Sequence, residues 1–328
     1  MIALKAFVST ETNLFIFVGE ICGLRNNPWS SIRRREWISR TGGRLNKEEL
    51  YFKRLLLSLF ISVPVEPIEA CFLAHEGKDL KASLAEYFSK KDINNLFLCL
   101  RFFKSRFLLI WKEDRRRLLR MARLLNQRSK NFSSALSNIL RLLGYENLKK
   151  PSLKLPAHIV LSSKNKDDIL GWFSALGSRL DVVLEYSHAA NAQKDNFACA
   201  VLLHEAFHFL LRNSKKTERI ILNASKKHSA LLSGIVSNMP PAELLTEILI
   251  SVYAPEGYLA NRYFDIRVPE MKQRHIGDKE RGGLVWLRRY AAYHAAPVAQ
   301  EYCDSKKAID DIFIHHLIQI LEKGRRLR

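Results

Sequence analysis

The stretch "LLHEAFHFLL", residues 202–211, decides how the second half of this 328-residue chain is expected to fold. Its apolar residues predict a buried helix that runs from about residue 196 to residue 212. This apolar run also contains two imidazoles, His204 and His208, and one carboxylate, Glu205. Burying polar groups without a partner costs free energy, so the pattern indicates that something pairs with them.

The spacing of these three residues favours a metal ion as the partner. Residues four apart lie on one face of a helix, so His204 and His208 can direct their rings at a common atom. Neutral imidazoles at this separation are suitable ligands for Zn²⁺. Glu205 lies about 100° around the helix and can reach a water held on the metal. Its carboxylate would take a proton from that water, which is the general-base step of metal-assisted hydrolysis.

The pattern His-Glu-Ala-Phe-His is an HExxH signature, and here the chain resembles the zincin metallopeptidases. The resemblance implies a zinc-dependent peptidase with Zn²⁺ as cofactor and a protein or peptide as substrate. No histidine follows at the HExxHxxGxxH spacing, which excludes the metzincin branch. The chain is similar to the gluzincin branch, in which a glutamate from a later helix binds the metal. Over about residues 195–260 it also resembles the compact zinc peptidase domains found with bacterial anti-repressor proteins.

A catalytic zinc site needs a third protein ligand and keeps one position open. The segment "PPAELLTEILISVYAP", residues 240–255, places Glu243 and Glu247 four apart on an apolar helix. The gluzincin resemblance implies that Glu243 binds the metal and that Glu247 orients a ligand histidine. Gluzincins often carry aspartate at the second position, so the reverse assignment of the two glutamates stays open.

A donor that stabilises the oxyanion is also expected in such a site. Among Tyr253, Tyr258, His275, Tyr290 and His294, we prefer His294 as a catalytic residue because it shares a helical face with Tyr290. Zincins bind substrate as an added strand at a sheet edge. We therefore predict that "DVVLEYS", the seven residues that begin at position 181, forms that edge.

The sequence changes character near residue 150, where "LKKPSLKLP" carries two prolines. We predict a basic, mainly helical domain over residues 1–150 and a zincin-like metallopeptidase domain over 151–328. In the second domain we expect strands at 157–163 and 181–187, with a short helix at 167–179 between them. The expected fold class is α+β and mostly helical, with a small zincin-like sheet packed on the HExxH helix.

Charge supports a competing function. The chain carries a net charge of +20, and residues 101–150 contribute 14 basic against 3 acidic residues. Such a segment attracts nucleic acid or another anionic surface. The alternative is therefore a basic nucleic-acid-binding protein that carries a secondary or inactive zincin domain. Aromatic residues interleaved with these cations suit either base stacking or a buried helix face; they are Phe102, Phe103, Phe107 and Trp111. A peripheral membrane helix at 93–125 is a weaker idea.

The five cysteines are far apart and form no CxxC pair, which argues against disulfides and against a thiolate metal site. No uncharged window is long enough to predict a transmembrane segment. The N-terminus resembles a signal peptide only faintly, because polar residues interrupt its apolar run. We expect a cytoplasmic protein.

Overall fold

A computed structural model gives the fold of residues 3–24, 28–74, 79–145, 154–161, 169–176, 179–186, 188–233, 235–236, 239–267 and 282–326. The contacts divide the chain into two compact units. Unit 1 comprises Met1–Leu4, Arg128–Lys154 and Ala192–Arg328, and unit 2 comprises Lys5–Gln127 and Leu155–Asn191. Both units draw segments from both sides of residue 150, so the division of the chain at that residue stays a prediction.

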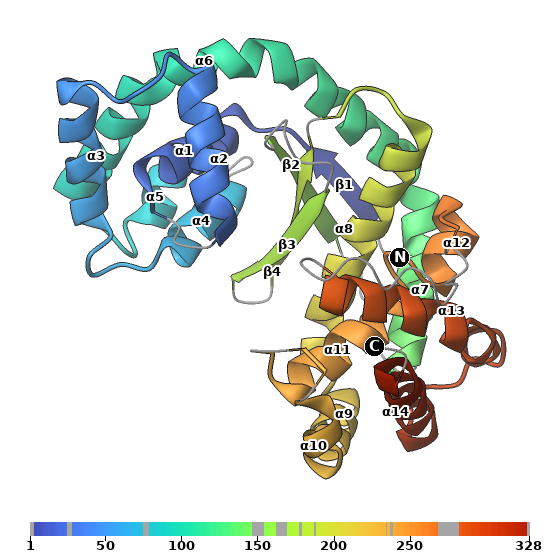
Figure 1. The fold of residues 1–328 in the computed structure, drawn as a ribbon. Coiled ribbons are helices and arrows are strands. Elements are labelled where there is room, and N and C mark those ends of the chain that lie inside the picture. Colours follow the sequence, from blue (N-terminus) through green and yellow to red (C-terminus); the bar gives the residue numbers. More distant parts are fainter. Residues whose placement is uncertain are drawn as a thin grey trace. The chain divides into compact units, whose positions relative to one another are not determined.

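Unit 2 is built around α1, a helix that is buried on nearly every side. Ser9 caps its first turn by accepting a hydrogen bond from the amide of Thr12, and Gly23 ends it with a φ of 86°, which favours glycine. Helices surround α1 (Figure 1) because its apolar residues cover the whole circumference. The helices of unit 2 are α1 (Thr10–Cys22), α2 (Pro28–Arg40), α3 (Lys47–Leu59), α4 (Val65–Ala74), α5 (Leu80–Leu84) and α6 (Lys90–Gln127).

Helix α6 is 38 residues long and runs without a break. One face of α6 lies in the core of unit 2. Arg106 is the buried cation on that face, and its guanidinium makes two hydrogen bonds to the carboxylate of Glu49, at 2.7 and 2.8 Å. A buried arginine is tolerated here because the pair is bidentate.

The four strands form one mixed sheet in the order β1-β2-β4-β3. Its strands are β1 (Ala3–Phe7), β2 (Lys154–Leu161), β3 (Leu170–Leu176) and β4 (Arg179–Tyr186). Strands β2 and β4 run parallel, with Ala157 opposite Val182, and β3 is antiparallel to β4, with Trp172 opposite Val183. The fold is therefore α+β and mostly helical, as the sequence predicted.

Two expectations about the sheet are wrong. The segment expected to be a short helix at 167–179 contains the edge strand β3, because a short apolar run does not distinguish the two structures until a strand pairs with it. The strand expected at the sheet edge, β4, lies between β2 and β3. Its backbone groups are paired on both sides, so β4 offers no free edge to an added strand.

Unit 1 is helical in the residues that the structure describes. Helix α8 packs against α7, α9, α11 and α12, and α11 packs against α9, α10, α13 and α14 (Figure 1). The helices of unit 1 are α7 (Ser129–Leu142), α8 (Ala192–Arg212), α9 (Lys215–Lys227), α10 (Ser229–Leu232), α11 (Pro241–Ser251), α12 (Tyr258–Phe264), α13 (Gly282–Asp304) and α14 (Asp311–Arg326).

The five cysteines are free and buried, as expected for small apolar core residues. Burial raises the pKa of Cys199 to about 12, so its thiol stays protonated at neutral pH. Of the helices that the structure describes, none combines the length and the apolar character that crossing a membrane requires.

Candidate metal centre

Helices α8 and α11 bring three potential metal ligands together inside unit 1. His204 and His208 come from α8, and Glu247 comes from α11. The two Nε2 atoms are 3.0 Å apart. Glu247 places Oε1 at 3.0 Å from Nε2 of His208 and Oε2 at 3.6 Å from Nε2 of His204. We call these three residues the His-His-Glu group.

The spacing of the His-His-Glu group fits a tetrahedral zinc ion. Ligand atoms at about 2.0–2.1 Å from such an ion lie about 3.3–3.4 Å from one another. The two Nε2 atoms are 3.0 Å apart, and they lie 3.0 and 3.6 Å from the two different oxygens of Glu247, close to that value. Two imidazole nitrogens and one carboxylate oxygen also form the donor set of a catalytic zinc site, which leaves the fourth position open.

A backbone carbonyl fixes the ring of His204. Its Nδ1 lies 2.9 Å from the carbonyl oxygen of Ala254. Because a carbonyl only accepts, Nδ1 carries the hydrogen, and the lone pair of Nε2 points into the His-His-Glu group. Burial, and then the positive charge of Arg288, lower the pKa of His204 to about 3 and keep the ring neutral. A neutral, oriented imidazole is the form that binds a metal.

The loop that supplies this carbonyl depends on Gly257. A Cβ at that position would lie 1.9 Å from the carbonyl oxygen of Val252. The same oxygen accepts a hydrogen bond from the amide of Tyr258 at 2.9 Å, so it cannot move without losing that bond. Glycine therefore permits the tight loop that holds Ala254 against His204.

Glu247 is ionised in this environment. Burial opposes its charge, but the hydrogen bond from His208 and the charges of His208 and Arg288 outweigh burial and lower the pKa of Glu247 to about 2. The nearest cation is Arg288 on α13, whose Nη1 lies 3.9 Å from Oε2 of Glu247. Arg288 is held in place because its Nε donates to Ser251 Oγ at 2.7 Å and its Nη2 lies 3.4 Å from Glu256.

Sequence reasoning missed Arg288. Its neighbour Arg289 is exposed, whereas Arg288 is half-buried between α11 and α13. A weak signal was available, since Arg288 follows the apolar Leu287 on a helix whose inner face is buried. Nothing in the sequence links it to Glu247, which lies 41 positions earlier along the chain.

Glu205 is positioned differently from the ligands. It is half-buried and makes no hydrogen bond to any residue that the structure describes. Burial, together with the negative charge of Glu247, raises the pKa of Glu205 to about 7 against the opposing charge of His208. A carboxylate that no hydrogen bond engages, one residue from a ligand histidine, is available to exchange a proton with a water molecule.

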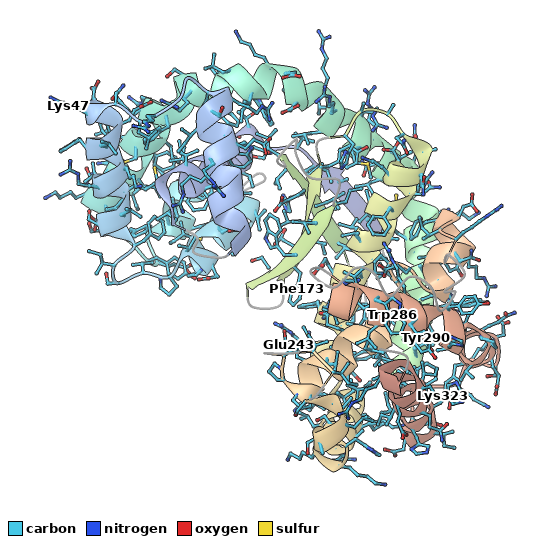
Figure 2. The ribbon with its side chains drawn as sticks, viewed as in Figure 1. Lys47, Phe173, Glu243, Trp286, Tyr290 and Lys323 are labelled. Carbon is cyan, nitrogen blue, oxygen red and sulfur yellow. The ribbon has the colours of Figure 1, made fainter. Side chains whose placement is uncertain are left out.

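The structure brings Glu247, and not Glu243, to the histidines. Glu243 is exposed in the first turn of α11, at the position labelled in Figure 2. Helix α8 meets α11 one turn further along, so only the later glutamate reaches His204 and His208. The assignment that the sequence left open is thus favoured in its reverse form, with Glu247 as the metal-facing carboxylate.

His294, the preferred oxyanion donor, is not joined to the group by any contact among the described residues. It is exposed on α13, with its ring centroid 4.3 Å from that of Tyr290, and its pKa is lowered by burial and by the charge of Lys323. Figure 2 labels Tyr290 on α13 and Lys323 on α14. His294 follows Arg288 by six residues, which places it about 240° around α13 and about 9 Å along it. His294 therefore does not share the face of α13 on which Arg288 meets Glu247.

Of the other expected donors that the structure describes, none makes a hydrogen bond or a ring contact with the His-His-Glu group. Tyr253 is buried between Phe207 and Phe313, and its hydroxyl has no hydrogen-bond partner in the described parts of the chain. The hydroxyl of Tyr258 accepts a hydrogen bond from Arg262 at 2.8 Å. His275 lies outside the described residues.

Comparisons with protein-family models, with curated proteins and with solved structures found no match to this chain. The functional assignment therefore depends on the chemistry of the His-His-Glu group and of Glu205. These residues offer three donor atoms of the types that zinc prefers, together with one carboxylate that no described side chain engages.

Proposed function

We propose that this chain is a zinc-dependent peptidase, with His204, His208 and Glu247 as metal ligands and Glu205 as the general base. The observation that carries the proposal is the convergence of the three ligand atoms, with His204 already oriented by Ala254. Hydrogen-bonded orientation of a ligand histidine is typical of metal sites.

Each residue has a distinct part in this proposal. When bound, a Zn²⁺ ion supplies a Lewis acid that polarises a carbonyl and acidifies water. Glu205 takes the proton from the attacking water and returns it to the departing amine, so the proton is conserved over the reaction. Arg288 lies beside Glu247 and helps to keep its carboxylate charged. The choice of a peptide bond as substrate comes from the resemblance of HEAFH to the zincins.

We also propose a cytoplasmic location. All five cysteines are unpaired and buried, which suits a reducing compartment.

The test combines metal analysis with a variant of Glu205. The purified chain is expected to bind one equivalent of zinc and to cleave a fluorogenic peptide mixture. Glu205→Gln keeps the shape of the side chain but cannot accept the proton. This variant should therefore retain zinc and lose at least about 100-fold in rate, within the range that general-base catalysis contributes. Full activity of Glu205→Gln would contradict its role, and a zinc-free active protein would contradict the metal assignment.

A further inference from the structure

The outward face of α6 carries a row of cations that no side chain in the described part of the chain neutralises. Six arginine and lysine residues on this face are exposed, and none makes a hydrogen bond or an ion pair with a residue that the structure describes. We call this set the basic stripe; its members are Arg101, Lys104, Lys112, Arg115, Arg116 and Arg123.

The acidic residues beside the basic stripe are already engaged elsewhere. Buried Asp114 lies 3.1 Å from Nη2 of Arg40 and 2.9 Å from Nη1 of Arg117. Glu113 lies 3.6 Å from the same two arginines. Because Arg40 and Arg117 occupy both carboxylates, no acidic side chain among the described residues pairs with the exposed cations of the stripe.

The stripe is long enough to face an extended polyanion. At about 100° per residue, its six members fall within a sector of about 120° on α6. From Arg101 to Arg123 the helix rises about 33 Å. A duplex rises about 3.4 Å for each base pair, so the stripe spans about one turn and can face the phosphates on the near side of that turn.

The middle of the stripe borders an open depression of about 520 Å³ that suits an anion. Lys112, Arg115 and Arg116 line it together with Trp111 and Thr10. Thr10 is the first residue of α1, a helix of 13 residues, so the positive end of the helix dipole lies at the depression. Glu11 is the acidic residue of that first turn, and three cations outweigh it.

The aromatic residues of α6 do not provide a stacking surface. Phe103, Phe107 and Trp111 are buried, with exposed fractions of 1%, 0% and 5%. Phe102 stacks on Phe52, with ring centroids 4.1 Å apart. The sequence had left base stacking open; the structure buries three of these rings in the core and stacks the fourth, Phe102, on Phe52. Recognition by α6 would therefore depend on backbone phosphates and would not depend on base sequence.

The same burial disfavours a membrane as the partner. A helix that lies in a membrane surface inserts its apolar face into lipid, but the apolar face of α6 packs inside unit 2. On its outward side the exposed large apolar residues of α6 are Leu98 and Leu109. Two isolated leucines are ordinary on a protein surface.

We infer that the basic stripe binds the phosphate backbone of duplex nucleic acid without sequence preference, with a phosphate seated in the depression at Lys112, Arg115 and Arg116. This site lies in unit 2 and does not depend on the proposed peptidase activity. It would give the chain a nucleic-acid partner in addition to a catalytic centre.

The experiment measures binding of the full chain to a fluorescein-labelled 25-base-pair duplex by anisotropy, at several salt concentrations. The test variant is Lys112→Gln, Arg115→Gln, Arg116→Gln. The matched control, Lys215→Gln, Lys216→Gln, Arg219→Gln, removes three exposed cations from α9. Both variants carry the same net charge, so bulk charge cannot separate them.

The test variant is expected to bind at least about tenfold more weakly at 0.1 M salt. Its plot of log affinity against log salt should be less steep by about 2.7, the slope of three lost phosphate contacts. The control should stay within about twofold of the unchanged chain. A second variant, Arg115→Lys, Arg116→Lys, keeps the charge and should retain most of the affinity, which separates loss of charge from loss of fold.

Three outcomes would overturn the inference. Equal weakening of the test variant and the control would mean that net charge alone drives binding. Absence of binding to the duplex at 0.05 M salt would show that the basic stripe is not a nucleic-acid site. Binding to vesicles that contain 20% phosphatidylserine, with no binding to the duplex, would identify a membrane as the partner instead.

Discussion

Glu243 and Glu247 lie one helical turn apart on α11. Glu243 is exposed, whereas the carboxylate of Glu247 contacts two histidines. We predict that Glu247→Gln lowers the affinity for zinc at least about 100-fold, because a neutral amide replaces an anionic ligand. Glu243→Gln should bind zinc like the unchanged chain. Competition against a chromogenic chelator measures both affinities.

His208→Ala provides a positive control for loss of a ligand. Weak zinc binding by Glu243→Gln together with normal binding by Glu247→Gln would show that the glutamates exchange roles when the metal is present, and would reject our choice of the third ligand.

The sequence predicted most of this site at the residue scale because the HExxH spacing places two imidazoles on one face of a helix. It could not rank Glu243 against Glu247, since both lie on the same side of an apolar helix. The position along α11 at which α8 packs determines which glutamate reaches the histidines. Tertiary packing sets that position, and the local sequence does not show it. Arg288 could not be predicted for the same reason, because its link to Glu247 exists only after α13 has packed.

At the scale of elements, the loop after α11 positions one residue of the His-His-Glu group, because the Ala254 carbonyl contacts His204. We predict that Gly257→Ala destabilises the chain by at least about 2 kcal/mol and weakens zinc binding, because the added Cβ meets the Val252 carbonyl at 1.9 Å. Moving that carbonyl also moves Ala254, which orients His204. Urea unfolding and chelator competition measure the two effects.

Gly19→Ala serves as the control for this loop, since its Cβ would meet Leu24 at an ordinary contact distance of 3.4 Å. Gly19 lies in the interior of α1, where alanine is at least as favourable as glycine. If Gly257→Ala were as stable as Gly19→Ala and bound zinc normally, the loop would not position His204.

Helices were more predictable than strands in this chain. The helix α11 begins after Pro240 with a second proline at its first position, a signal that sequence alone supplies. The strand β3, in contrast, reads "LGWFSAL", which suits a short helix until β4 pairs with it. Pairing is a non-local property, and the local sequence does not contain it.

At the scale of the whole molecule, zinc is expected to stabilise the folded chain. The reason is that zinc would bind the folded chain more tightly than the unfolded chain. With free zinc at about 100 times its dissociation constant, we predict a gain of about 2.7 kcal/mol in the free energy of unfolding. Hydrogen exchange should slow in α8 and α11, which carry the ligands. Calorimetry with zinc and with EDTA measures the gain.

The same calorimetry on Glu247→Gln should show a much smaller shift. An equal gain in both proteins would locate the stabilising metal outside the His-His-Glu group and would leave the proposed peptidase without its ion.

The basic stripe also affects the thermal stability of the chain. Lys112 and Arg116 stand one turn apart with like charges, an arrangement that weakens a helix by a few tenths of a kcal/mol. Neutralising either one should therefore make the isolated chain slightly more heat-resistant at low ionic strength. A repulsive pattern of this kind does not help the chain to fold, so engineering for thermal stability would select against the cations that we infer to contact a polyanion.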